Sequence, residues 1–276
     1  MKKPLFDLHG THNPHRYYLP VVQDLCVGAI DRQFLFGGVG LASAIEALER
    51  TCKRPVIWAT AQYLSFARPG SVVDLDVLVP AEGRQTSQAR CLLHVDDKQI
   101  VTVLAALGNR DEAHAGQWVE KPDVPMPDDC PAVQNWRGNK AGLDTRFEMR
   151  LASGRLWHGG RFLGTGEQGR TRLWLRSTEG HVSDSKMLAV AADFVSNGIG
   201  HAIGRHAGGN SLDNTIRFVN AASSEWMLCD IHIEAIHAGV VHGTMHLFTP
   251  SGTLMAIASQ SLILRLHAEP AANTGG

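Results

Sequence analysis

The chain has 276 residues, of which 44% are hydrophobic and 19% are charged, and its formal net charge is −1. This composition is ordinary for a globular protein, and the length suits one large domain or two of usual size. Without a block of basic residues or a run of roughly 20 apolar residues, the chain predicts no nucleic-acid partner, no anionic membrane surface and no membrane span.

The first half of the chain reads as one helix followed by four strands. The first 20 residues contain two lysines but no apolar run, so we expect no signal peptide. The stretch after "FLFGG" is rich in Ala, Leu, Ile and Glu at helical spacing, which predicts a helix over residues 39–51. Strand-like runs separated by turn sequences follow at 56–67, 71–82, 85–97 and 99–108.

The second half repeats this order. A strand-like run at 170–177 precedes a second apolar helix, which starts after Asp184 or Ser185 and is expected to reach about Arg205. Four further strands are predicted at 211–219, 226–239, 240–250 and 253–266. Each half therefore predicts a small antiparallel sheet that wraps one central helix, and the fold class is α+β.

The domain boundaries follow from the segments that lack periodicity. Residues 110–142 are rich in Pro, Asp and Gly and are interpreted as a linker. The sequence thus predicts one domain over 1–109, a second over 143–267, and a disordered tail over 268–276.

Asp193 interrupts the apolar stretch "KMLAVAADFVSNGIG" of the second helix. A buried carboxylate without a partner is costly, so its presence needs a reason. Its helical stripe is small and polar, and periodicity alone leaves two interpretations open: a narrow solvent-facing edge, or a carboxylate that points into a cleft.

Gln260 is the one polar residue on an otherwise apolar face of the last predicted strand. A core glutamine needs hydrogen-bond partners, which either a structural group or a functional site could supply. Ser211 lies on a polar strand face that by itself favours plain exposure. Phe36, Gly37 and Gly38 precede a helix, where glycines allow close approach of a ligand and free amides can polarise a carbonyl; the alternative is an ordinary turn.

Several other kinds of site lack support. The five cysteines are odd in number and far apart, which favours reduced thiols in a cytoplasmic protein over a disulfide framework or a zinc site. The histidines of the second-half strands have no supporting carboxylate or cysteine spacing, so no metal site is predicted. There is no nucleophile elbow, phosphate-binding loop or dinucleotide fingerprint, and no cofactor is expected.

Taken in order, several motifs resemble the type II acyl-CoA thioesterases. In the first half these are "LFGGVGLASAIEALERT", "LSFARPGSVVDLDVLV" and "GRQTSQARCLLHVDDKQIVTVLAALG"; in the second half they are "MLAVAADF", "SLDNTIRFV" and "SGTLMAIASQSLILR". The resemblance implies a double hotdog, with two antiparallel sheets each wrapped around a long central helix. It also implies hydrolysis of fatty acyl-CoA without a cofactor, and a homo-oligomer of double hotdogs.

The same resemblance implies three catalytic residues. The aspartate of the family's helix motif falls on Asp193, a strand threonine falls on Ser211, and a glutamine of the last strand falls on Gln260. Together they would activate a water molecule, while Phe36, Gly37 and Gly38 would contact the substrate. The sequence departs from the family at Ser211, at Asn214, where histidine is usual, and at Val39, where glutamine is usual.

Two alternatives to this function stay open. One is a non-catalytic hotdog protein that binds acyl or lipid groups. The other is a hotdog hydratase or dehydratase, which would need an Asp–His pair; "DFVSNGIGH" has both residues but lacks the expected proline.

Overall fold

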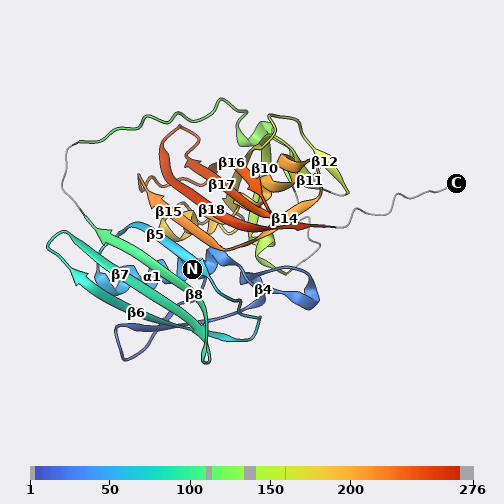
Figure 1. Cartoon of the computed structure of the whole chain (residues 1–276). Helices are drawn as coiled ribbons and strands as arrows, with labels where there is room; N and C mark the ends of the chain where they lie inside the picture. The colour runs from blue at the N-terminus through green and yellow to red at the C-terminus, as the bar shows by residue number, and fades with distance from the viewer. Residues whose placement is uncertain (1–3, 110–113, 134–140, 159, 268–276) are drawn as a thin grey trace.

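The computed structural model describes residues 4–109, 114–133, 141–158 and 160–267, and it is built around one antiparallel sheet of fourteen strands (Figure 1). The first half of the chain supplies one side of this sheet, in the order β1 (His9–Gly10), β2 (Arg16–Pro20), β6 (Val72–Glu82), β7 (Thr86–Val95), β8 (Lys98–Gly108) and β5 (Val56–Tyr63). The second half continues it with β15 (Asp213–Phe218), β18 (Leu254–Leu266), β17 (Val240–Phe248), β16 (Met227–His237), β13 (Arg170–Ser177), β10 (Phe147–Ser153) and β9 (Ala132–Val133), and β14 (Ala207–Ser211) also pairs with β18.

The sheets predicted for the two halves join edge to edge into one. β5 and β15 pair antiparallel, with Thr60 opposite Thr215, and the two hydroxyl oxygens of this pair lie 2.7 Å apart. A strand at the edge of a sheet leaves a row of backbone N–H and C=O groups without partners. Here β5 is the edge strand of the first half and β15 that of the second, and their pairing supplies these partners. The junction makes one continuous sheet of the two halves.

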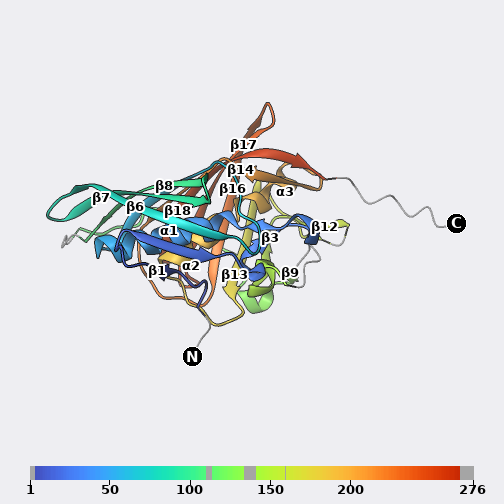
Figure 2. The same ribbon diagram turned by 90° about the horizontal axis from the view of Figure 1, so that it is seen from below.

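The helix α1 (Gly37–Cys52) forms as its composition predicts. Eleven of its residues are buried, and it packs against α2 and the four strands β5 to β8. It ends at Lys53, whose backbone is left-handed with φ 53°, a common way to end a helix. Figure 2 shows α1 beside α2 on one face of the sheet.

The second predicted helix is broken rather than long. The helix α2 (Ser185–Ala192) is capped by Asp184, whose carboxylate accepts a hydrogen bond from the Met187 amide at 2.8 Å. It stops at Asp193 and is followed by the 3₁₀ turn η5 (Val195–Gly198) and the short helix α3 (Ile199–Ile203). The glycines of "VSNGIG" weaken the helix after Asp193. The apolar sequence pattern therefore extends several residues beyond the end of α2.

The predicted strands of the first half and the last three of the second half are present, with bounds within a few residues of the prediction. The predicted strand 211–219 appears as β15, while Ser211 is the last residue of β14, a strand that the sequence did not predict. No strand was predicted for β1, β2, β9 and β10, nor for the small hairpin of β11 (Leu156–His158) with β12 (Arg161–Leu163). A second small hairpin pairs β3 (Cys26–Val27), where the sequence has only a weak strand-like run, with β4 (Phe34–Leu35). Part of the predicted linker is structured, because η3 (Pro127–Asp129) and β9 lie within it, and the tail 268–276 lies outside the described residues.

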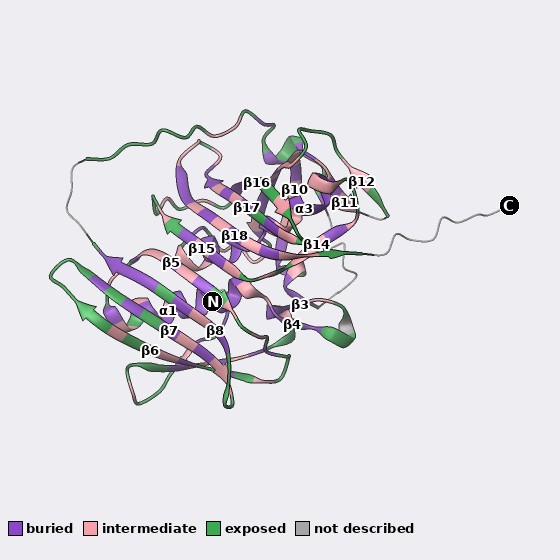
Figure 3. Cartoon of the chain, in the orientation of Figure 1, coloured by how far each residue is buried: buried purple, intermediate pink, exposed green. Residues whose placement is uncertain are grey.

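The core lies between the helices and one face of the sheet. Buried and exposed residues alternate along β6 and β7 (Figure 3), as expected for strands with one face covered. Among the described residues, no helix is long and apolar enough to cross a membrane, and no group of three or more His, Cys, Asp or Glu side chains could hold a metal ion. All five cysteines are free and buried.

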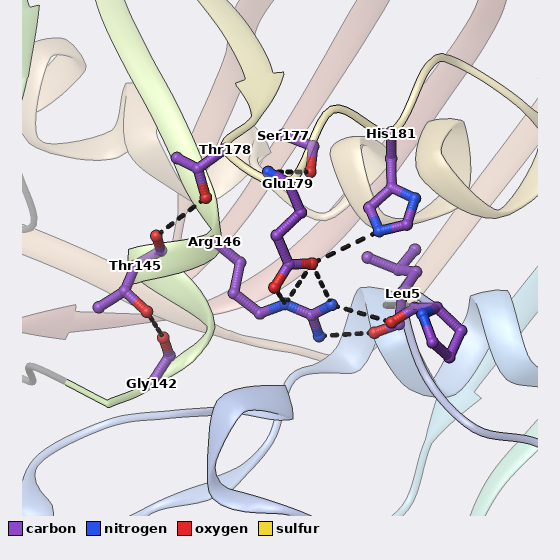
Figure 4. Close-up of polar contacts among 9 residues, drawn as sticks. Leu5, Gly142, Thr145, Arg146, Ser177, Thr178, Glu179 and His181 are labelled. Carbon is purple, nitrogen blue, oxygen red and sulfur yellow. Dashed lines mark hydrogen bonds and ion pairs between the residues drawn. The ribbon is translucent and has the colours of Figure 1, made fainter. Parts of the chain in front are cut away.

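Arg146 ties the start of the chain to the second half (Figure 4). It lies at the end of the 3₁₀ turn η4 (Leu143–Arg146) and is 4% exposed. Its guanidinium donates to the carbonyl oxygens of Leu5 at 2.6 Å and Pro4 at 3.1 Å, and it forms an ion pair with Glu179 at 2.5 Å. A buried arginine is tolerated because its hydrogen-bonding groups are satisfied in this way.

Candidate active site

Asp193 lies at the point where α2 ends, and its side chain is buried, with 4% exposure. The interpretation as a solvent-facing helix edge therefore does not hold. One carboxylate oxygen, Oδ2, accepts a hydrogen bond from the Gly38 amide at 2.7 Å. The residue is thus a buried carboxylate held against the first turn of α1, where the helix dipole favours negative charge.

The other carboxylate oxygen of Asp193 faces the sheet. Its Oδ1 accepts a hydrogen bond from the Gln260 amide group and lies 3.4 Å from the Ser211 hydroxyl. The Gln260 amide group also donates to the Ser211 hydroxyl at 2.8 Å. The three residues singled out from distant parts of the sequence therefore lie in one hydrogen-bonded cluster.

The break between β14 and β15 explains how Ser211 joins this cluster. Ser211 pairs with Leu262 of β18, whereas Thr215 pairs with Ser259 of the same strand, and Leu212 lies between the two strands. The strand alternation expected across 211–219 is interrupted there, so Ser211 is half-buried and its hydroxyl meets Asp193 instead of lying on a plainly exposed face.

Asn214 is a fourth contact of the carboxylate. It is fully buried on β15, and its amide group donates to Oδ1 of Asp193 at 3.5 Å. From the sequence alone, this position was only a departure from the family pattern. In the structure its side chain supplies a polar group to the cluster in place of the usual histidine.

Gly37 and Gly38 are required by the closeness of the packing. A Cβ atom on Gly37 would lie 2.7 Å from Oδ2 of Asp193 and 3.0 Å from the Tyr63 ring, and one on Gly38 would lie 2.9 Å from the carbonyl oxygen of Val190. Larger residues at either position would displace the carboxylate. The Gly38 amide donates to Asp193, so it is not the free amide that was expected to polarise a carbonyl.

Burial raises the pKa of Asp193 from 3.8 to about 6. Desolvation is the main cause, and the hydrogen bonds from Gln260, Gly38, Ser211 and Asn214 counteract part of it. The carboxylate is therefore ionised at neutral pH but has a pKa close to the range in which a general base is effective.

Three polar atoms around Asp193 have no hydrogen-bond partner in the described part of the chain. They are Oε1 of Gln260, Oδ1 of Asn214 and the hydroxyl of Tyr63, and all three are buried. Buried polar atoms are normally satisfied, so an unpartnered group of this kind is a typical mark of a functional site. Sequence reasoning missed Tyr63; the only signal was its place within the predicted strand 56–67.

Two cavities adjoin the cluster. A small one of about 20 Å³ is lined by Phe36, Asp193 and Phe194 together with the apolar side chains of Leu143 and Met149, and it has room for about one water molecule. The Phe36 and Phe194 rings meet edge to face at 5.6 Å, which places Phe36 next to the carboxylate. A larger cavity of about 390 Å³ shares Ser196 and Asn197 with the small one.

The Asp–His pair of a hydratase is not assembled here. His201 is buried, but its Nδ1 lies 3.3 Å from the Thr171 hydroxyl and from the Arg155 amide, and no contact with Asp193 is present among the described residues. The carboxylate is instead surrounded by hydrogen-bond donors that carry no charge. This arrangement suits a base that activates water better than an acid–base pair with histidine.

Comparison with known proteins gives a consistent result. The family model of the acyl-CoA thioesterase N-terminal domain matches residues 28–108, and that of the acyl-CoA thioesterase C-terminal domain matches residues 127–264. A solved structure from Novosphingobium aromaticivorans, titled "putative thioesterase", is 36% identical with a TM-score of 0.85, over 94% of this chain and 98% of that chain.

More distant structures share the fold. Acyl-CoA thioesterase II TesB2 from Mycobacterium marinum is 19% identical with a TM-score of 0.73, over 95% of this chain and 97% of that chain. A protein with a hot dog fold from Alicyclobacillus acidocaldarius is 16% identical with a TM-score of 0.79, over 95% and 97% of the two chains. No curated protein matches the chain in sequence.

Proposed function

The chain belongs to the acyl-CoA thioesterase family and is a thioester hydrolase, and we propose that it cleaves fatty acyl-CoA with a water molecule activated by Asp193. The observation that carries this mechanism is the buried cluster in which Gln260, Ser211 and Asn214 all contact one oxygen of the Asp193 carboxylate. A base with a pKa of about 6 is ionised at neutral pH and can still accept a proton.

In this mechanism the cluster both holds the water and takes its proton. The water donates one hydrogen to the Asp193 carboxylate and the other to Oε1 of Gln260, which has no partner among the described residues. Its lone pair then attacks the thioester carbonyl carbon, and the proton passes from Asp193 to the departing CoA sulfur as the carbon–sulfur bond breaks. Fixing the water in this way removes much of the entropic cost of the attack.

The oxyanion needs a donor other than Gly38, because the Gly38 amide is bound to Asp193. We assign this role to the Tyr63 hydroxyl, together with the amide of Gly37 at the start of α1. The Tyr63 ring lies against Gly37, and its hydroxyl is buried without a partner in the described chain. Burial and the nearby charges of Asp193 and Asp213 raise the pKa of Tyr63 against the smaller opposing effect of the neighbouring Asn214 side chain, so the hydroxyl keeps its proton and can donate it in a hydrogen bond.

We infer that the two family domains are two hotdog units, the second with a shortened helix, whose sheets join at β5 and β15. We also propose that the chain forms a homo-oligomer, since Leu78 and Leu104 expose apolar side chains on the outer face of the first-half sheet. A measurement of mass in solution by light scattering tests this, and a monomer at micromolar concentration would contradict it. The five free, buried cysteines support a location in the reducing cytoplasm.

The experiment that tests the function is a thiol-release assay across acyl-CoA chain lengths, comparing the wild type with Asp193→Ala. Asp97→Asn is the matched control, because Asp97 is exposed on the turn between β7 and β8. We expect release by the wild type and the control and none by Asp193→Ala. A protein that binds acyl-CoA tightly without releasing thiol would be a non-catalytic binder, and an unchanged rate in Asp193→Ala would refute the role of Asp193.

A further inference from the structure

The larger cavity beside the active site has a distinctive lining. Its lining comes from β4, β11, α3 and β14, together with the segment that precedes η2 (Ile30–Arg32), so both halves of the chain contribute to it. Its volume of about 390 Å³ falls in the range of small-molecule sites. We call it the rim cavity.

One wall of the rim cavity is aromatic. The rings of Trp157 and His206 are stacked, with centroids 5.0 Å apart and an angle of 8° between the planes. The His267 ring follows, 4.5 Å from that of His206. The wall is held by backbone contacts, since the His267 amide donates to the His206 carbonyl at 3.0 Å. A wall of flat rings favours a flat ligand over an aliphatic chain.

The same cavity carries positive charge and an unsatisfied donor or acceptor. Arg265 lines it, opposite Gly208 in the pairing of β14 with β18, and it is exposed without an ion-pair partner among the described residues. Nε2 of His206 is buried and has no hydrogen-bond partner in the described chain. A guanidinium suits a phosphate group, and a buried ring nitrogen suits a polar heteroatom of a ligand.

The rim cavity is connected to the reaction centre through Ser196 and Asn197, which line both cavities and follow Asp193 closely in sequence. A ligand that extends from the rim cavity past Ser196 and Asn197 into the small cavity would reach Asp193. We propose that the rim cavity binds the phosphorylated adenosine of CoA, with the base against the wall of Trp157 and His206 and the phosphates at Arg265. This inference rests on the proposed function. The acyl group of the substrate would then lie on the apolar side of Asp193.

The test compares two substrates that share one acyl chain. Acyl-CoA carries the phosphorylated adenosine and acyl-pantetheine lacks it, so KM and kcat are measured with both for Trp157→Ala and Arg265→Gln. Trp118→Ala and Arg84→Gln are matched controls, since Trp118 is 91% exposed and Arg84 is exposed in the turn between β6 and β7. We expect each rim-cavity variant to raise KM for acyl-CoA about tenfold, to leave KM for acyl-pantetheine unchanged, and neither control to alter KM for either substrate.

A second readout separates this inference from the proposed function. Binding of adenosine 3′,5′-bisphosphate is measured by calorimetry, and it is expected to weaken in Trp157→Ala and Arg265→Gln whether or not the wild type releases thiol. If the wild type releases no thiol but binds the bisphosphate at this cavity, the proposed function fails and the inference stands. Equal losses with both substrates would show that the cavity takes the acyl group, and unchanged bisphosphate binding in both variants would likewise overturn the inference.

Discussion

Replacing Asp193 by asparagine is expected to abolish hydrolysis and, at neutral pH, to stabilise the fold. Asparagine keeps the shape of the side chain and an oxygen that can accept from Gln260 and Ser211, but it carries no charge. The wild-type carboxylate is buried and ionised at neutral pH, and burial of that charge has an energetic cost. The substitution therefore separates what the charge does for catalysis from what it costs in stability.

The magnitude follows from the pKa of Asp193, which folding raises from 3.8 to about 6. A raised pKa means that the folded state favours the protonated carboxyl, so this contribution is full below pH 3.8 and is lost as the pH rises through about 6. This rise in pKa corresponds to about 3 kcal/mol of unfolding free energy. The asparagine amide fits the Gly38 amide less well than a carboxylate does, which reduces the expected gain at pH 8 to about 1–2 kcal/mol.

The assay is urea unfolding of the wild type and Asp193→Asn at pH 4.5, 6 and 8, alongside thiol release. The advantage of the variant is expected to grow as the pH rises across this range and then to level off. Asp97→Asn, which changes an exposed carboxylate, should show neither effect. A stability difference that does not depend on pH, or an Asp193→Asn protein that still releases thiol at the wild-type rate, would refute the reasoning.

Four further results are expected. The kcat/KM of the wild type should fall below about pH 6, because Asp193 must be ionised to accept a proton, and a pH–rate profile measures this. Gly38→Ala should lower kcat/KM by about 100-fold, since its Cβ would lie 2.9 Å from the Val190 carbonyl oxygen and displace the carboxylate. Tyr63→Phe should lower kcat about tenfold or more while leaving the urea midpoint unchanged, because the hydroxyl has no partner in the described chain. Arg146→Ala should reduce the free energy of unfolding by about 2–3 kcal/mol, since it leaves buried partners unpaired, and urea unfolding tests this.

Much of the fold could be predicted because the signals were local. Turn sequences and strand alternation located the strands that follow each helix, and the helix over 39–51 was evident from its composition. The pairing of β5 with β15 had no local signal, since it depends on two edges that meet only after both halves fold. The end of α2 at Asp193 was missed for a similar reason: the apolar run continues, and the contact that holds the carboxylate comes from Gly38 in the other half.

The candidate site shows the same division between local and long-range information. Gln260 could be singled out because one polar residue on an apolar strand face is visible in the sequence itself. Ser211 could not be placed by alternation, because the chain bends at Leu212 and the strand period breaks there. Asn214, in contrast, follows the strand alternation of β15, which buries its side chain. Nothing in the sequence indicated that this side chain would contact Asp193.

The site exists only because the two halves share one sheet. Gly38 and Tyr63 come from the first half, whereas Asp193 and Gln260 come from the second, and the pairing of β5 with β15 brings the ends of these elements together. The Tyr63 amide donates to the Leu212 carbonyl at 2.9 Å, directly beside the bend that turns Ser211 inward. The same junction therefore aligns the proposed oxyanion donor with the groups that hold the water, and a change that loosened it would lower activity before it unfolded either half.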